Sequence, residues 1–373
     1  MTALVRGRLV LDDEIMPGAL HIEDGLISRI EAGGAEAAEP LIVPGFVDIH
    51  VHGWGGHDAM GSTADLDGMA RALLHRGVTS FLPTAVTAGL DRLQEFAERV
   101  REWRPRAPSD GADPLGFNLE GPFLSPARKG AQNPAFMVEP ASVDFDACLG
   151  PLVDGLRVMT VAPEVRGGRE LIGWLCRHGI VVSLGHSSAT LEEAQAGYAA
   201  GARSTTHLFN AMTGVDHRSP GLAVAALADD GVAVELIADG QHVAPSLWPI
   251  VARAKPPDRL ILVSDALPFA GLGEGRTSLG GLEVEVRGPR ATLAGSDTLA
   301  GSVIALDSAV RNMVRNGAAL PAAVAAAARN PLALIGVTDR GRLAVGQRAD
   351  LVELDDDLEV RRVARAGAWI SLR

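Results

Sequence analysis

The 373-residue sequence contains few cysteines and few lysines. Its two cysteines, Cys148 and Cys176, exclude a disulfide framework and indicate a reducing compartment. Its two lysines are Lys129 and Lys255, so arginine supplies nearly all of the positive charge. With 34 basic and 46 acidic residues, the formal net charge is −12. This acidic balance argues against a nucleic-acid-binding protein, which usually presents a basic face.

Long hydrophobic runs are also missing. The longest apolar stretch, residues 318–328, contains Pro321 and is much shorter than the roughly 20 residues of a membrane-spanning helix. We therefore expect it to be an ordinary helix of a soluble protein. The first ten residues lack the charged start, apolar centre and small-residue cleavage site of a signal peptide. These features predict a cytoplasmic protein with no membrane partner.

Both ends of the chain show short, strand-like runs. Near the N-terminus, an Asp24-Gly25 turn separates two apolar runs, which is a strong hairpin signal. The Ala- and Glu-rich stretch after Gly33-Gly34 is expected to be a connector, and the C-terminal runs flank three aspartates, 355–357. We predict one small β-sandwich domain built from residues 1–43 and 340–373, with a larger domain between them.

The middle of the chain, residues 44–339, has a different rhythm. Apolar runs that end in Gly, Pro or polar residues alternate with helical patterns, such as the one-faced pattern from Leu66 to Leu74 and the Thr190/Glu193 capping box. This alternation predicts a (β/α)₈ barrel of the TIM type, whose chemistry lies at the carboxyl ends of the strands. The eight runs are 42–51, 78–83, 115–119, 157–162, 180–184, 204–208, 233–238 and 260–264.

Six polar residues stand at the predicted strand ends. Two of them, His50 and His52, are two residues apart on one strand, so their side chains face the same side. Imidazole and carboxylate ligands without thiolates suit Zn²⁺, Fe²⁺, Mn²⁺ or Co²⁺. We therefore predict a divalent metal site at one shared mouth, with Asp265 as the acid/base that moves a proton from water to the leaving amine. The predicted metal ligands are His50, His52, Glu120, His186 and His207.

Two further residues are candidates for substrate contact. His242 follows the seventh predicted strand and is expected to face the mouth. Arg218 lies in a loop after the sixth strand, where a guanidinium can bind a phosphate through two hydrogen bonds, although an isolated loop arginine is usually only solvated.

Together, these motifs resemble the amidohydrolase superfamily and, within it, the N-acetylglucosamine-6-phosphate deacetylase family. The resemblance covers essentially the whole chain, from the barrel motifs into the terminal strands. The residues that carry it are 44–53 (PGFVDIHVHG), 118–123 (NLEGPF), 185–187 (GHS), 206–212 (THLFNAM), 220–223 (PGLA), 238–242 (ADGQH), 263–266 (VSDA), 299–302 (LAGS) and 346–351 (GQRADL).

The resemblance implies a metal-dependent hydrolase that converts N-acetylglucosamine 6-phosphate to glucosamine 6-phosphate and acetate, usually as a homodimer. It implies Glu120, His186 and His207 as the main metal ligands and Asp265 as the catalytic acid/base. Some members lack the first-strand histidines and hold one metal; this sequence has both, so one or two ions are expected. Substrate contacts are implied for Asn210, Ala211, Arg218, His242 and Leu299, with Arg218 reaching across the dimer.

One position departs from the family pattern. Many members carry a histidine within a Lys-Gly-X-His-Asn-Pro stretch, where this sequence has Gln132. Glutamine can still donate a hydrogen bond to the substrate, but it cannot carry charge. Substrates that remain open are another acetamido sugar, such as N-acetylgalactosamine 6-phosphate, and an unphosphorylated sugar.

Two other classes of protein were weighed. A dihydroorotase-like cyclic amidase would place a carbamylated lysine at the end of strand four, but that run ends Ala162-Pro163-Glu164. A binding protein on the same barrel would have lost metal ligands, and none of the six strand-end residues is missing.

Overall fold

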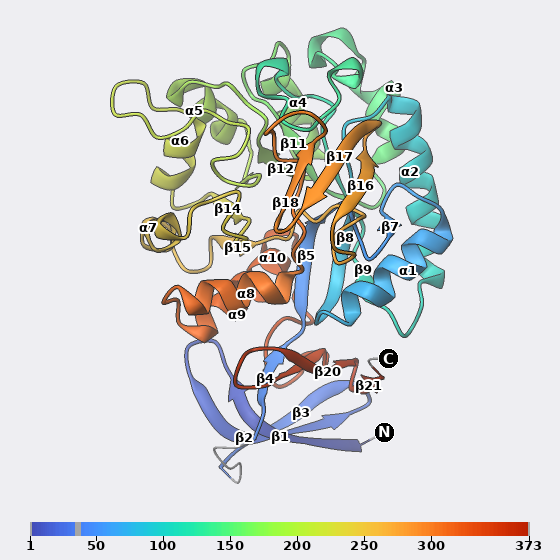
Figure 1. Ribbon diagram of the computed structural model, residues 1–373, viewed down its shortest axis with the longest axis vertical. Coiled ribbons are helices and arrows are strands. Elements are labelled where there is room, and N and C mark those ends of the chain that lie inside the picture. Colours follow the sequence, from blue (N-terminus) through green and yellow to red (C-terminus); the bar gives the residue numbers. More distant parts are fainter. Residues whose placement is uncertain (1, 34–38, 372–373) are drawn as a thin grey trace.

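The computed structural model describes residues 2–33 and 39–371. The connector expected after Gly33 falls on residues 34–38, outside this part of the chain. Figure 1 shows a barrel surrounded by helices and, at one end of it, a separate sheet built from strands of both terminal segments. The predicted fold class, a TIM-like barrel with a small β domain from both termini, is confirmed.

Parallel strands form the barrel, and their neighbours follow the chain order. Backbone hydrogen bonds close the ring at the mouth, where the Asp265 N–H donates to the His50 carbonyl at 2.9 Å and the His52 N–H donates to the Ala266 carbonyl at 2.9 Å. Within the described residues the barrel strands are β5 (Phe46–Val51), β8 (Val78–Ala85), β10 (Phe117–Glu120), β11 (Leu156–Val161), β12 (Val181–Leu184), β13 (Ser204–Thr205), β14 (Ala233–Leu236) and β15 (Leu260–Leu262).

Helices cover the outside of the barrel because each carries one apolar face. In α1, the buried side chains Leu66, Met69, Ala70 and Leu73 recur every three or four residues. The predicted capping box opens α5, where Thr190 accepts from the Glu193 N–H. The helices are α1 (Thr63–Leu74), α2 (Leu90–Trp103), α3 (Phe145–Leu149), α4 (Gly168–Arg177), α5 (Leu191–Ala199), α6 (Leu222–Ala228), α7 (Trp248–Ala254), α8 (Leu306–Arg315), α9 (Leu320–Ala327) and α10 (Arg329–Leu334).

The barrel interior has its own apolar cluster. Alternate strand residues divide between two cores: Val158 and Ile261 pack in the interior cluster, whereas Met159 and Leu262 belong to the larger core beneath the helices. The interior cluster also includes Leu332 of α10. The interior is therefore filled with side chains, as expected for a barrel of this size, and the polar residues are left for the mouth.

The terminal sheet combines both chain ends in the order β21-β20-β19-β4-β1-β2-β3. It is attached to the barrel through Asp113, whose carboxylate accepts from Arg340 at 2.5 Å, Arg348 at 2.6 Å and Arg365 at 3.0 Å. Its strands are β1 (Thr2–Val10), β2 (Ile15–Glu23), β3 (Leu26–Ala32), β4 (Leu41–Pro44), β19 (Leu351–Leu354), β20 (Val360–Arg365) and β21 (Ala368–Ile370).

The first predicted run, 42–51, is divided between two sheets. β4 pairs with β1 and β19 of the terminal sheet, whereas β5 pairs with β8 of the barrel. Gly45 is the residue between them, and a Cβ there would lie 2.1 Å from the Thr79 hydroxyl oxygen. Only glycine therefore allows the chain to pass this closely from one sheet to the other.

A second difference is an antiparallel sheet inserted after the last barrel strand. It consists of β16 (Gly275–Leu279), β17 (Leu282–Arg287) and β18 (Arg290–Leu293). The sequence analysis expected strands of this style only at the chain ends. Leu279, Val284, Val286 and Ala291 anchor the insert through a separate apolar cluster that includes Leu267.

Short strands complete the fold: β6 (Gly53–Trp54) pairs with β7 (His57–Asp58), and β9 (Asp113–Pro114) pairs with the first half of β8. The apolar stretch 318–328 forms α9, which begins at Leu320. Among the described residues, every helix is too short or too polar to span a bilayer.

Candidate metal centre and substrate cavity

A cavity of about 310 Å³ opens at the carboxyl ends of the barrel strands. This volume is at the lower end of the range typical of small-molecule sites. Side chains from the strand ends and from the β16–β18 insert share its wall. The lining residues include His52, Glu120, Gln132, His186, His207, Asn210, Ala211, His242, Asp265, Asp297 and Leu299.

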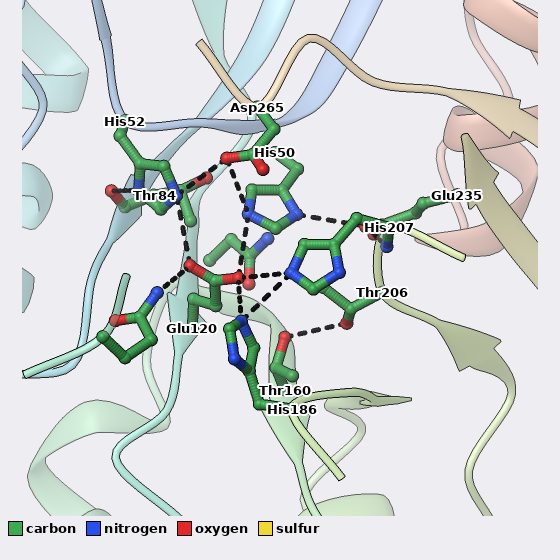
Figure 2. A network of polar contacts seen from close by, with 12 residues as sticks. His50, His52, Thr84, Glu120, Thr160, His186, Thr206, His207, Glu235 and Asp265 are labelled. Atoms are coloured by element: carbon green, nitrogen blue, oxygen red, sulfur yellow. Dashed lines mark hydrogen bonds and ion pairs between the residues drawn. The ribbon is translucent and has the colours of Figure 1, made fainter. Parts of the chain in front are cut away.

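The Glu120 carboxylate lies at the centre of the cluster of histidines (Figure 2). The Nε2 atoms of His186 and His207 lie 2.9 and 2.8 Å from Glu120 Oε1, and 3.1 Å from each other. The other oxygen, Oε2, lies 3.2 Å from His52 Nε2. Glu120 therefore faces histidines on both sides and is placed to bridge two positions.

His50, His52 and Asp265 form a second group next to the first. Asp265 Oδ1 lies 3.2 Å from His52 Nε2 and 3.7 Å from His50 Nε2. In each of the two groups, the candidate ligand atoms lie within 4.8 Å of one another, and all six side chains are buried.

The atoms of both groups suit a divalent cation. Ligands about 2.0–2.1 Å from a tetrahedral Zn²⁺ lie about 3.3 Å from one another, close to the spacing of Glu120, His186 and His207. Inside the protein, His50 Nε2 has no hydrogen-bond partner among the described residues. Lone pairs that converge on one point, with a buried nitrogen left unpaired there, are what a metal ion would satisfy, so the two groups fit a divalent metal site.

Outer hydrogen bonds fix the orientation of three of the rings. The Nδ1 atom of His52 lies 3.0 Å from the Thr84 carbonyl oxygen, and that of His186 lies 2.9 Å from the Arg128 carbonyl oxygen. His50 Nδ1 lies 3.0 Å from Glu235 Oε2. Because these acceptors place the ring proton on Nδ1, Nε2 is left free to bind a metal.

Three of the site residues have left-handed backbone conformations. The φ angles are +45° at His186, +30° at His207 and +49° at Asp265. Non-glycine residues seldom adopt this region, and such strain concentrates at functional sites. In this protein the three left-handed residues lie where strands pass into loops, and their side chains point toward the mouth.

The pKa values of the metal-free site show strong coupling between the imidazoles and the carboxylates. Burial lowers the pKa of His52, but hydrogen bonds with Asp265 and Glu120 raise it more, to about 9. Burial raises the pKa of Glu120, but the charges of His186 and His50 hold it well below its usual value. Metal binding must therefore displace protons from histidine.

Among the predicted substrate-contact residues, Asn210, Ala211, His242 and Leu299 line the cavity. The His242 Nδ1 atom lies 2.7 Å from Asp239 Oδ2, which fixes the ring. Burial lowers the pKa of His242, and this contact with Asp239 raises it by more.

Gln132 also lines the cavity, but its amide is already engaged at both ends. Its oxygen accepts from the Thr87 N–H at 2.8 Å, and its NH₂ group donates to Glu120. In this structure Gln132 therefore orients the central carboxylate, whereas the sequence analysis considered it only as a substrate contact.

The structure does not bring Arg218 to the cavity of its own chain. It is exposed in the loop after Thr213, where Asp216 accepts from the backbone N–H groups of Arg218 and Ser219 at 2.8 and 2.7 Å. Among the described residues, no lysine or arginine lines the cavity.

Sequence reasoning missed several residues that the structure brings to the site. Glu235 and Thr84 contact the histidines, Asp239 holds His242, and Asp297 of the insert lies on the rim. One signal was available for Glu235, because a lone carboxylate interrupts the apolar run 233–238.

Comparison with known proteins identifies the family of the chain. The amidohydrolase family profile matches residues 41–370. The chain is 38% identical to an N-acetylgalactosamine-6-phosphate deacetylase of Escherichia coli O157:H7, over 97% of this chain and 98% of that protein. It is also 38% identical to the human N-acetylglucosamine-6-phosphate deacetylase, over 98% of this chain and 90% of that protein.

A solved structure shows the same architecture. The N-acetylglucosamine-6-phosphate deacetylase of Thermotoga maritima superposes with a TM-score of 0.92 at 34% identity and covers 99% of both chains. With its two buried ligand groups at the mouth of the barrel, the chain therefore belongs to the amidohydrolase family, among the deacetylases of amino-sugar 6-phosphates.

Proposed function

We propose that the protein hydrolyses the acetamide of N-acetylglucosamine 6-phosphate to give glucosamine 6-phosphate and acetate. The observation that carries this proposal is the pair of adjacent buried ligand groups, with Glu120 of one group 3.2 Å from His52 of the other, beside a cavity of about 310 Å³, in a chain similar over its whole length to such deacetylases. The test is acetate release from this substrate by the metal-loaded protein, with a chelator-treated sample as control.

The residues divide the chemistry between them. A divalent metal supplies polarisation of the acetamide carbonyl and lowers the pKa of water to near neutrality. Asp265 lies at the cavity wall and moves the proton from the attacking water to the leaving amine. His242, held by Asp239, is placed to hydrogen-bond the substrate at the same wall.

The ligand set suits Zn²⁺ first, and Fe²⁺, Mn²⁺ or Co²⁺ as alternatives, because it contains imidazole and carboxylate and no thiolate. We propose one ion at Glu120, His186 and His207 and a second at the group of His50, His52 and Asp265. Elemental analysis after loading with excess zinc should approach two ions per chain. A value of one that is unchanged by the His50→Ala, His52→Ala double variant would contradict the second position.

Recognition of the phosphate is proposed to need a second copy of the chain. The cavity wall includes the carboxylates of Glu120, Asp265 and Asp297 and no lysine or arginine from the described residues, so a phosphate there has no ammonium or guanidinium group to bind. The amides around Asn210 and Ala211 form one side of its binding site. An Arg218 from the partner of a homodimer supplies the missing charge, because in its own chain that loop is exposed.

Mixed dimers test this arrangement. Arg218→Ala keeps the acid/base and Asp265→Asn keeps the arginine, so each variant alone lacks one part. If the arginine acts across the interface, random mixing restores about one quarter of the sites, since half of the dimers are mixed and one site in each is complete. If the arginine acts within its own chain, the mixture is no more active than the two variants measured separately.

Arg218→Ala should also separate the substrates. A charged bidentate contact is worth roughly 1.5–3 kcal/mol, so the Michaelis constant for the 6-phosphate should rise about tenfold to a hundredfold. The constant for the unphosphorylated sugar should barely change. Equal losses on both sugars would contradict the phosphate assignment. Lys129, which precedes the cavity-lining Gly130, is the control position: Lys129→Ala should leave both constants near wild type.

The 4-epimer is a second candidate substrate, because the Escherichia coli relative is an N-acetylgalactosamine-6-phosphate deacetylase. Side-by-side measurement of kcat/KM for the two 6-phosphates decides between them. We also propose that the protein acts in the cytoplasm, since a charged sugar phosphate is retained inside the compartment where it is formed.

A further inference from the structure

We propose that Glu235 is a positioning residue that makes binding of the second metal ion possible, by fixing His50 and by supplying a negative charge beside the two ligand groups. The inference rests on the proposed second ion at His50, His52 and Asp265. Glu235 does not line the substrate cavity, so its role is exerted through the ligands.

Glu235 belongs to β14 and faces the barrel interior. Its strand neighbours at alternate positions, Ala233 and Ile237, pack in the interior cluster, whereas Val234 and Leu236 belong to the core beneath the helices. Figure 2 shows its side chain beside His50 and His207. The carboxylate is therefore enclosed in the barrel, directly beneath the mouth.

One carboxylate oxygen connects the two ligand groups. Glu235 Oε2 lies 3.0 Å from His50 Nδ1 and accepts the backbone N–H of His207 at 3.2 Å. The first contact places the His50 ring proton on Nδ1 and leaves Nε2, which has no hydrogen-bond partner, facing Glu120 and Asp265. A carboxylate on the far nitrogen of a histidine ligand is a common means of orienting it and raising its basicity.

The charge of Glu235 is otherwise uncompensated. Its side chain is 1% exposed, its Oε1 atom has no hydrogen-bond partner, and among the described residues its only ion-pair partner is His50. A buried carboxylate without a cation is unfavourable, and Glu120 and Asp265 nearby carry the same sign. Two divalent ions bring four positive charges, and Glu235 raises from two to three the number of carboxylates that belong to the ligand groups or contact a ligand ring.

The position of this carboxylate suggests that its effects on the two ions differ. It contacts a side chain in the second group, His50, but only the backbone of the first group, at His207. Removal of the charge should therefore weaken the second ion much more than the first.

The experiment measures each ion separately in the metal-free full-length protein. Zinc is titrated in competition with a chromophoric chelator, and bound metal is counted by elemental analysis; Co²⁺ spectra report the coordination of each ion. Glu235→Gln keeps an acceptor oxygen for both contacts and removes only the charge, whereas Glu235→Ala removes both. His52→Ala marks loss of the second ion. Glu164→Gln is the matched control, because Glu164 binds Ser187 and Ser188 beside His186 without contacting a ligand side chain.

We expect Glu235→Gln to weaken the second ion about tenfold to a hundredfold, Glu235→Ala to weaken it further, and both to leave the first ion within about threefold. Thermal unfolding verifies that each variant is folded. If the alanine variant does not fold, the metal affinities of the glutamine variant alone test the proposal. Two ions bound with wild-type affinities in the glutamine and alanine variants, or equal weakening of both ions, would overturn the inference. A wild-type protein that holds one ion would overturn the two-metal proposal as well.

Discussion

Replacement of Asp265 by asparagine separates proton transfer from binding of the first metal ion, although Asp265 is also a proposed ligand of the second ion. The amide keeps the shape of the side chain and one oxygen at the position 3.2 Å from His52 Nε2, but it cannot accept a proton at neutral pH. The ion at Glu120, His186 and His207 should remain, because Asp265 is not part of that group. The expected defect is therefore in turnover.

The expected loss of turnover combines the usual contribution of acid–base catalysis with the lack of a substitute base at Glu120. General acid–base catalysis contributes about 10²–10⁴ in rate, or about 2.7–5.4 kcal/mol in activation free energy. Both oxygens of Glu120 are occupied by histidines and Gln132, so this neighbour is not free to take over the proton. We therefore expect kcat to fall at least a hundredfold, with the Michaelis constant little changed.

The assay is acetate release at saturating substrate, with metal content measured on the same sample. Asp297→Asn is the control, because Asp297 lines the same cavity but is exposed on the insert; its turnover should stay near wild type. A loss in the Asp265→Asn variant of less than tenfold, with metal retained, would move proton transfer to another group. Loss of the first ion as well would refute the separation of roles.

The remaining predictions concern the ligands, the pH response and stability. His186→Ala or His207→Ala should lose metal and activity together, and full metal content with near-normal turnover would contradict the ligand assignment. In the metal-free protein the pKa of His52 is raised to about 9, so its stabilisation is fully present below the unfolded value of about 6.5. This contribution is lost as the pH rises through about 9; urea unfolding should show the decline, and His52→Ala should flatten it. Asp113→Asn leaves three arginines without their shared carboxylate and should lower the free energy of unfolding by about 2–3 kcal/mol, between the values of exposed and buried pairs; the exposed Asp110, as Asp110→Asn, should cost under about 1 kcal/mol.

Much of the fold could be predicted because the barrel strands appear in the sequence as continuous apolar runs. Each of the eight predicted runs overlaps a barrel strand, since strands buried on both faces must be apolar along their length. The β16–β18 insert was missed because its strands are short and half exposed and are separated by glycine-containing turns. A signal was present in the alternation of Leu282, Val284 and Val286 after the Gly280-Gly281 turn, which is typical of a hairpin.

The clustering of the candidate metal ligands could be predicted because the ends of parallel strands converge on one mouth, so position along the chain determines position in space. Contacts between side chains do not follow from position along the chain in this way. The sequence does not show that the Gln132 amide hydrogen-bonds to Thr87 and Glu120, or that Glu235 contacts His50 from a strand far along the chain.

The most direct test of the proposed function is the rate of acetate release from N-acetylglucosamine 6-phosphate, compared with N-acetylglucosamine, by the zinc-loaded protein. The account predicts metal-dependent release, abolished by a chelator and restored by zinc, with kcat/KM at least about tenfold higher for the phosphorylated sugar from the charged contact alone. Release that survives complete metal removal, or no release from the 6-phosphate, would contradict it.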